Sequence, residues 1–188
     1  MIVLGNKFKV VFVIVILLIG FQLQSKGLTL SAIGNYYISS DENYKNYYGN
    51  GSILPSVKLT INLTKGVYLW GGYGYLSEKG ETKGLKLKIK STEHILDFGV
   101  GINLQIAKPL SFFVEGGGTL ASYSEDSFGS VKKGSGLGYS GNAGIRVYFS
   151  KSLFVVLAGG YSNVQTTINN VDLKLGGIKA GGGLGVSF

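Results

Sequence analysis

Residues 94–106 alternate strictly between two kinds of side chain. Apart from its first residue, one set is apolar: His94, Leu96, Phe98, Val100, Ile102, Leu104 and Ile106. The other set is polar or small: Glu93, Asp97, Gly99, Gly101, Asn103 and Gln105. A period of two residues is typical of a β-strand, whose successive side chains point to opposite faces. The same pattern recurs in residues 56–63 and 137–149, so the chain is predicted to be all-β with one oily face.

Weaker alternation predicts five further strands, at residues 28–38, 67–76, 110–123, 153–164 and 173–188. The connections between these strands alternate between tight turns and long polar segments. The tight turns are at residues 64–66, 107–109 and 150–152, and the long polar connections are at residues 40–52, 77–91, 124–134 and 165–172. Short turns on one side and longer loops on the other are typical of transmembrane β-barrels. We therefore expect a single antiparallel up-and-down barrel of about eight strands, with both chain ends on the side of the short turns.

The N-terminal segment has the layout of a secretory signal. Lys7 and Lys9 precede an apolar core at residues 10–20, which is followed by the polar residues Gln22, Gln24, Ser25 and Lys26. An uncleaved anchor is the alternative, but this core is shorter than the roughly 20 residues that a spanning helix needs. We expect residues 1–25 to be a helical signal peptide and residues 26–188 to form the barrel domain. The chain has no cysteine, so an exported protein would fold without disulfides.

Charged residues on the polar faces are expected to point into the barrel. Turning Arg146 toward a bilayer midplane would cost roughly 2–4 kcal/mol. A barrel of about eight strands is just wide enough for side chains to fill it, which predicts a plugged lumen. The predicted interior cluster is Lys58, Asp97, Glu115, Arg146 and Lys179, with Glu93 nearer the outer rim. An aromatic girdle near the turns is predicted from Tyr68, Trp70, Tyr148, Phe149 and Phe188.

The strand pairs joined by tight turns, at residues 61–76 (INLTKGVYLWGGYGYL), 102–118 and 145–161, resemble the small outer-membrane barrel family that includes OmpX and the membrane domain of OmpA. The last strand ends in Phe188 and is similar to the C-terminal signal that this family presents to the barrel-assembly machinery. The resemblance implies the outer membrane of a Gram-negative-type bacterium, periplasmic chain ends, and no catalytic residue or cofactor.

His94 is the one histidine in the sequence. Some small outer-membrane barrels act on lipid A, and a serine hydrolase would need a histidine base beside a serine and an acid, such as Ser91 or Ser77 with Glu93. A noncatalytic, interfacial His94 is the interpretation that we favour. No set of residues has metal-ligand spacing, so we predict no metal and no enzyme activity.

Two of the connections suggest external contacts. Tyr44, Tyr47 and Tyr48 are expected to contact an extracellular protein or glycan, although a solvated loop is the alternative. The alternation of residues 85–90 is out of phase with that of residues 94–106, which predicts a β-bulge near Ser91. Lysines in this hairpin are expected either to bind lipopolysaccharide phosphates or simply to maintain solubility: Lys79, Lys83, Lys86, Lys88 and Lys90.

The function expected from the sequence is structural and surface-interactive, through envelope integrity or adhesion. A narrow porin-like solute channel, a lipid A-modifying enzyme and a lipocalin-like carrier of apolar ligands are the alternatives. The expected partners are outer-membrane lipid, lipopolysaccharide, the assembly machinery and an extracellular protein or glycan, without nucleic acid.

Overall fold

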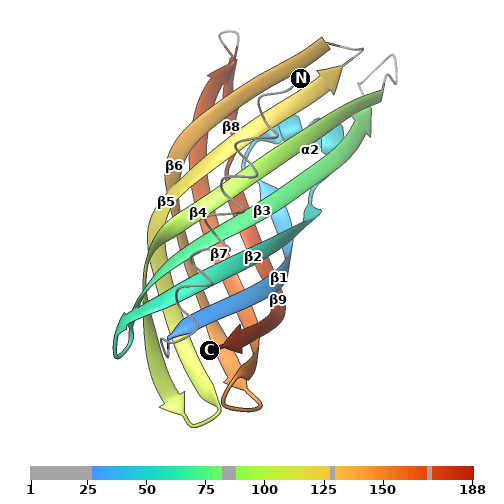
Figure 1. Ribbon diagram of the computed structural model, residues 1–188. Helices are drawn as coiled ribbons and strands as arrows, with labels where there is room; N and C mark the ends of the chain where they lie inside the picture. The colour runs from blue at the N-terminus through green and yellow to red at the C-terminus, as the bar shows by residue number, and fades with distance from the viewer. Residues whose placement is uncertain (1–26, 82–87, 128–129, 169–170) are drawn as a thin grey trace.

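The computed structural model describes residues 27–81, 88–127, 130–168 and 171–188 (Figure 1). The predicted signal peptide lies outside these ranges. The elements are β1 (Leu28–Ser39), α2 (Glu42–Tyr48), β2 (Ser52–Thr64), β3 (Val67–Glu81), β4 (Lys88–Ala107), β5 (Leu110–Ser127), β6 (Ser130–Tyr148), β7 (Leu153–Ile168), β8 (Val171–Lys174) and β9 (Gly177–Ser187). No helix among the described residues has the length and apolar character needed to cross a bilayer.

Eight of these strands close into an antiparallel barrel. Each strand from β1 to β7 pairs with the next, and β9 pairs with both β7 and β1. The closing seam runs from Thr29 opposite Ser187 to Ser39 opposite Gly177, where β1 and β9 lie side by side (Figure 1). β8 pairs with β7 and lengthens that hairpin beyond the barrel wall. The predicted all-β, up-and-down barrel is confirmed.

The alternation decides which side chains face out. Along β4 the even-numbered residues Leu96 to Ile106 are all exposed on the outer wall, whereas the odd-numbered Glu93, Ile95 and Asp97 are buried. Outward-facing leucine, valine, isoleucine and phenylalanine side chains form a band around the barrel. Because this band is apolar and the interior is polar, the wall is inverted relative to that of a water-soluble domain.

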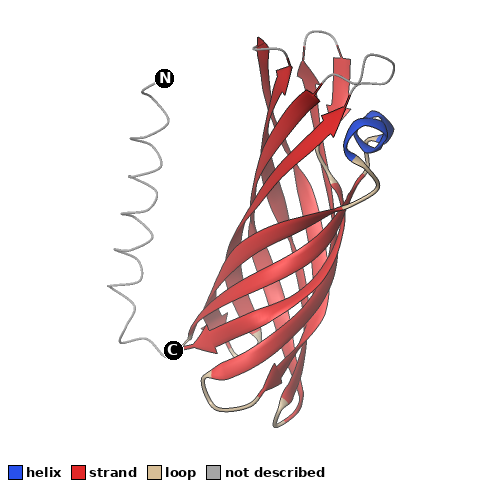
Figure 2. Cartoon of the chain, turned by 90° about the vertical axis from the view of Figure 1, so that its right-hand side faces the viewer, coloured by secondary structure: helices blue, strands red, loops and turns tan. Residues whose placement is uncertain are grey.

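Three of the expected connections are largely strand. β3 and β4 remain paired up to Glu81 and Lys88, and β5 and β6 up to Ser127 and Ser130, so these strands extend well beyond α2 (Figure 2). Strand pairing continues in these hairpins because the backbone N–H and C=O groups of the two strands bond to each other, whether or not the side chains are apolar. The polar composition of residues 124–134 and 165–172 indicated loops, and that interpretation was wrong. The hairpin that contains residues 85–90 was instead expected to project beyond the bilayer as an exposed sheet, as the pairing of β3 with β4 indicates.

The predicted bulge near Ser91 is also wrong. The pairing of β4 with β3 and β5 runs through Ser91 and Thr92 without a register shift. Ile89 is instead buried on the inner side, together with Ser91 and Glu93. The apolar phase changes because Ile89 turns inward at the loop end of β4, while its neighbours Lys88 and Lys90 are exposed on the outer wall.

Two glycines permit aromatic rings to lie flat against the inner wall. A Cβ atom at Gly101 would be 2.4 Å from the ring of Tyr68, and one at Gly185 would be 2.1 Å from the ring of Phe154. Both distances are impossible for real atoms, so a side chain at either position would displace the ring. The glycines therefore make room for the aromatic interior described next.

Candidate functional site

An ion network crosses the middle of the barrel interior. Lys58 Nζ on β2 lies 2.6 Å from Glu115 Oε2 on β5, and the Glu115 side chain has no exposed surface. Tyr68 donates a hydrogen bond of 2.9 Å to Glu115 Oε1, and Arg146 Nη2 lies 4.0 Å from the same oxygen. One buried carboxylate thus faces two cations. The pairing compensates the cost of removing these charges from water.

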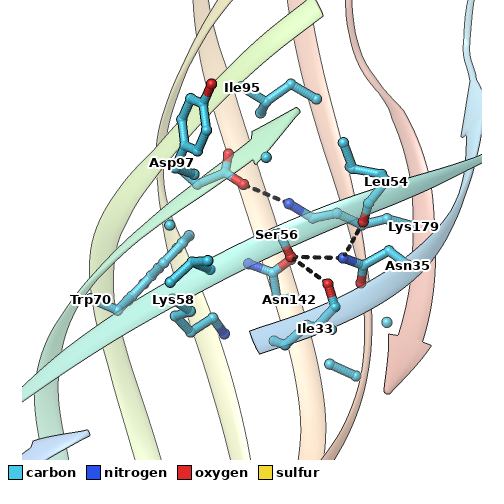
Figure 3. A pocket seen from close by; sticks show the side chains of 16 residues that line it. Ile33, Asn35, Leu54, Ser56, Lys58, Trp70, Ile95, Asp97, Asn142 and Lys179 are labelled. Atoms are coloured by element: carbon cyan, nitrogen blue, oxygen red, sulfur yellow. Dashed lines mark hydrogen bonds and ion pairs between the residues drawn. The ribbon is translucent and has the colours of Figure 1, made fainter. Parts of the chain in front are cut away.

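A second ion pair lies across the lumen, nearer the loops. Lys179 Nζ on β9 is 2.6 Å from Asp97 Oδ2 on β4 (Figure 3). Thr119 donates a hydrogen bond of 2.5 Å to Asp97 Oδ1. The structure therefore brings together all five residues of the predicted interior cluster, in two groups. Their partners are consistent with charge neutralisation inside the wall.

Beside Lys179 and Asp97 lies a cavity of about 40 Å³. Asn35 donates hydrogen bonds to Leu54 O and Ser56 Oγ along its edge, as Figure 3 shows. A water molecule needs roughly 10–15 Å³ of such space, so the cavity has room for a few waters. It is far too small for a drug-sized or lipid ligand.

Aromatic rings pack below and around the ion network. Tyr68, Trp70, Phe113 and Phe154 are buried in one cluster, and Tyr148 packs against it. The Arg146 guanidinium carbon lies 4.6 Å from the centroid of the Phe113 ring, which places the cation against an aromatic face.

The predicted girdle was therefore wrong for Tyr68, Trp70 and Tyr148, which face the interior. Phe149 and Phe188 are exposed. The β3 segment carries glycine or apolar residues on both faces, so alternation alone could not assign its aromatic residues.

Helix α2 lies at the loop-side mouth, beside the end of β1 (Figure 2). The Asp41 side chain caps it by accepting a hydrogen bond from Tyr44 N at 3.0 Å and also accepts one from Lys174 N at 3.2 Å. A helix was not expected in this connection. The missed signal is the capping Asp41 followed by tyrosines spaced three and four residues apart.

Tyr44 and Tyr48 point from α2 toward the inner wall. The Tyr44 hydroxyl donates to Glu78 Oε2 on β3 and lies 3.1 Å from Ser91 Oγ on β4. The Tyr48 hydroxyl donates to Glu125 Oε2 on β5 at 3.1 Å. Tyr44 also packs against buried clusters on opposite sides of the mouth. Of the three tyrosines expected to contact external partners, Tyr47 is the exposed one.

A third carboxylate, Glu93, is buried beneath α2. It is 3 % exposed, and its Oε1 atom has no hydrogen-bond partner within the described part of the chain. Burial, followed by the nearby charge of Glu78, raises the pKa of Glu93 to about 8. The groups around it are Glu78 on β3, Tyr44 on α2, Tyr37 on β1 and Tyr123 opposite it on β5.

These neighbours carry no positive charge. Burial raises the pKa of Glu78 as well, although the hydrogen bond from Tyr44 opposes that shift. Burial also raises the pKa of the Tyr37 and Tyr44 hydroxyls, so both stay protonated at neutral pH. The mouth is therefore an environment that favours a protonated Glu93.

His94 lies on the outer wall, away from the candidate acid and one candidate serine. The Tyr73 hydroxyl is 2.7 Å from His94 Nδ1, and the Tyr75 ring centroid is 5.2 Å from that of His94. Glu93 and Ser91 are on the inner side of the same strand. The structure thus separates His94 from Glu93 and Ser91, whereas Ser77 is exposed on the same outer wall as His94. Among the described residues no three His, Cys, Asp or Glu side chains gather as metal ligands.

The remaining predicted residues lie at the two ends of the barrel. Lys79, Lys88 and Lys90 are exposed on the outer wall, and Lys83 and Lys86 lie outside the described residues. Phe188 donates its backbone N–H to Leu28 O at 2.8 Å and accepts from Gly27 N at 3.0 Å, so it extends the closing seam.

No protein-family model and no curated protein matches the sequence. Solved structures do match. Neisserial surface protein A has a TM-score of 0.60 at 12 % identity, covering 86 % of this chain and 96 % of its own. The fold is that of a small outer-membrane barrel. The N-terminal barrel domain of Pseudomonas aeruginosa OprF has a TM-score of 0.52 at 18 % identity, covering 87 % and 98 %.

The Escherichia coli outer membrane protein W has a TM-score of 0.51 at 10 % identity, covering 88 % of this chain and all of its own. At these identities the small-barrel likeness concerns the path of the backbone alone. The interior charges, α2 and the outer lysines must be interpreted from this chain's own residues.

Proposed function

We propose that this small barrel is an integral outer-membrane protein with a sealed lumen and a structural, surface-interactive role. The band of exposed apolar side chains supports membrane insertion, because a closed barrel leaves no unpaired backbone in hydrocarbon. In this proposal the chain ends and short turns lie in the periplasm, and the long hairpins and α2 lie outside the cell.

Three sets of contacts inside the barrel support the proposal of a sealed lumen. Ion pairs from Lys58 and Lys179 cross the interior, the cluster containing Phe113 lies at the turn side, and Tyr44 spans the mouth. Three successive barriers favour a scaffold over a solute channel. The separation of His94 from Glu93 and Ser91 favours a role without catalysis.

Planar-bilayer recording tests the seal. The full chain should give no unitary conductance under conditions in which a known porin conducts. A variant with residues 41–50 replaced by a glycine–serine linker should also remain silent, since the ion network and aromatic cluster persist. Reproducible channel openings from the unaltered chain would replace this proposal with the narrow-channel alternative.

Labelling tests the orientation. The chain has no cysteine, so single-cysteine variants can be read without background. A membrane-impermeant maleimide added to intact cells should label Asn50→Cys beside α2 but not Lys151→Cys in a short turn. The reverse pattern would overturn the proposed orientation.

Loss of cell adhesion in Tyr47→Ala, with Tyr36→Ala as a control on the outer wall, would support the surface role.

A further inference from the structure

Four lysines are exposed on the outer wall at the loop end of β3 to β6: Lys79, Lys88, Lys90 and Lys133. We call this group the lysine wall. Lys79 lies directly opposite Lys90 in the β3–β4 register. Lys133 is opposite Ser124, which is itself opposite Thr92, so the wall spans four strands. Like charges facing each other across strands destabilise a sheet. The position of Lys79 opposite Lys90 therefore does not favour folding.

Acidic residues offset only part of this charge. Asp126 is opposite Lys90 in the strand register. On the described outer faces of these hairpins, four lysines thus accompany one aspartate. The excess of positive charge attracts an anion, and phosphate monoesters are strong acceptors for ammonium groups.

A polar and aromatic layer lies below the lysine wall. Tyr73 and Tyr75 flank His94, and the Tyr73 hydroxyl and the His94 ring are joined by a hydrogen bond of 2.7 Å. Ser122 lies opposite both His94 and Ser135 on the neighbouring strands. Such residues suit the boundary between hydrocarbon and water, where hydroxyl-bearing groups of a lipid would lie.

An open groove of about 380 Å³ continues from this layer into the apolar band. Leu96, Leu120 and Leu137 lie opposite one another across β4, β5 and β6 and line it. Its floor is exposed and apolar, as an acyl chain requires. The outer wall therefore passes from apolar through polar to cationic, from Leu137 through Ser135 to Lys133 along β6 and from Leu96 through His94 and Thr92 to Lys90 along β4.

We propose that this wall is a binding site for a phosphorylated glycolipid of the outer leaflet, with an acyl chain in the leucine groove and its headgroup phosphate on Lys79, Lys90 and Lys133. The inference rests on the membrane location given under the proposed function. A soluble anion would use the lysines but not the groove. The continuity of the two surfaces is what favours a lipid.

The test uses the folded full chain in detergent micelles and fluorescent lipid A carrying two phosphates. A Lys79→Gln/Lys90→Gln/Lys133→Gln variant should bind this probe roughly tenfold more weakly, since each lysine near an anionic surface contributes measurably. Added salt should weaken binding of the unaltered chain. The matched control is Lys65→Gln/Lys108→Gln/Lys151→Gln, which removes the same charge from the short turns and should bind normally.

A second variant tests the groove without touching the charges. Leu96→Ala/Leu137→Ala changes two outward side chains and should weaken lipid A binding while leaving binding of a heparin fragment unchanged. Equal lipid A affinity in the lysine variant and the unaltered chain would overturn the inference. Lipid A affinity that is unchanged by the leucine substitutions would also overturn the inference, because it would indicate a general anion site. Conductance and resistance of the same preparations to detergent unfolding report separately on the proposed function.

Discussion

At the residue scale, Glu115 has the most demanding position in the interior. Its side chain is inaccessible, and it is the shared partner of Lys58, Arg146 and the Tyr68 hydroxyl. Removing one member of a buried ion pair leaves a charge without compensation, which costs more than the pair contributes. The two cations therefore depend on this single carboxylate.

We predict that Glu115→Gln lowers the free energy of unfolding by about 3 kcal/mol. The amide can still accept the Tyr68 hydrogen bond, but it leaves Lys58 and Arg146 unbalanced. Urea unfolding of the protein in lipid vesicles, followed by tryptophan fluorescence, measures the change.

Glu42→Gln is the matched control for this substitution, because Glu42 is exposed in the first turn of α2 and should change stability little. Adding Lys58→Met to Glu115→Gln should recover part of the loss, since it removes one uncompensated cation. An unfolding curve of Glu115→Gln that superimposes on that of the unaltered chain would show that the network does not stabilise the barrel.

At the element scale, α2 is a short helix whose inner side is held by hydrogen bonds to carboxylates. Tyr44 binds Glu78 and Tyr48 binds Glu125, while Glu93 lies buried behind them. Water would reach Glu93 if α2 left the mouth. The position of the helix is therefore coupled to the protonation of this carboxyl group.

We predict that α2 is held most firmly at acid pH. With α2 in place the pKa of Glu93 is about 8, against an ordinary value of 4.5. The packed state therefore binds more protons between these values, so its stability is greatest below about pH 4.5 and declines as the pH rises toward 8. A spin label at Tyr47→Cys should become more mobile across this interval.

Glu93→Gln supplies the comparison for the spin-label experiment. A neutral amide cannot ionise, so label mobility should be nearly constant with pH in this variant. Equal pH dependence with and without Glu93 would assign the effect to another group, of which Glu78 is the nearest acid. Mobility that falls with rising pH in the unaltered background would contradict the sign of the coupling.

At the scale of the whole molecule, the seam between β1 and β9 converts a sheet into a barrel. It joins residues at opposite ends of the described chain, with Ala32 opposite Leu184 on the outer wall. Without this pairing two long edges would be exposed, and such edges are not tolerated in hydrocarbon. Closure is thus the condition on which every inward-facing contact depends.

We predict that Ala32→Cys/Leu184→Cys forms a disulfide in the folded protein. Paired positions on adjacent strands bring Cα atoms to about 4.5–5.5 Å, within the range that a disulfide spans. Oxidised protein, boiled without reductant, should migrate faster on a gel than the reduced form. Ala32→Cys/Ile178→Cys is the control, since Ile178 lies opposite Ile38 and should not cross-link. Efficient cross-linking of the control would contradict the register.

The sequence by itself determined the strands, their number and the face on which most charged residues lie. Alternation is a local property: once a segment is extended, the parity of a residue fixes its side, as for Arg146 and Asp97. The same reasoning failed for Tyr68 and Trp70 because both faces of β3 are apolar or glycine-rich. It also failed for residues 124–134 and 165–172, whose polar composition concealed continued strand pairing.

Only the tertiary structure decided which residues meet. Glu115 pairs with Lys58 from a strand 57 positions away, and Asp97 with Lys179 from one 82 positions away. These ion pairs depend on the stagger of the eight strands and on closure of the barrel. Neither property can be predicted from a short segment of sequence. The inward orientation of α2 has the same origin, because its hydrogen-bond partners Glu78, Ser91 and Glu125 come from three different strands. Parity assigns a side chain to a face, whereas closure of the barrel assigns its neighbours.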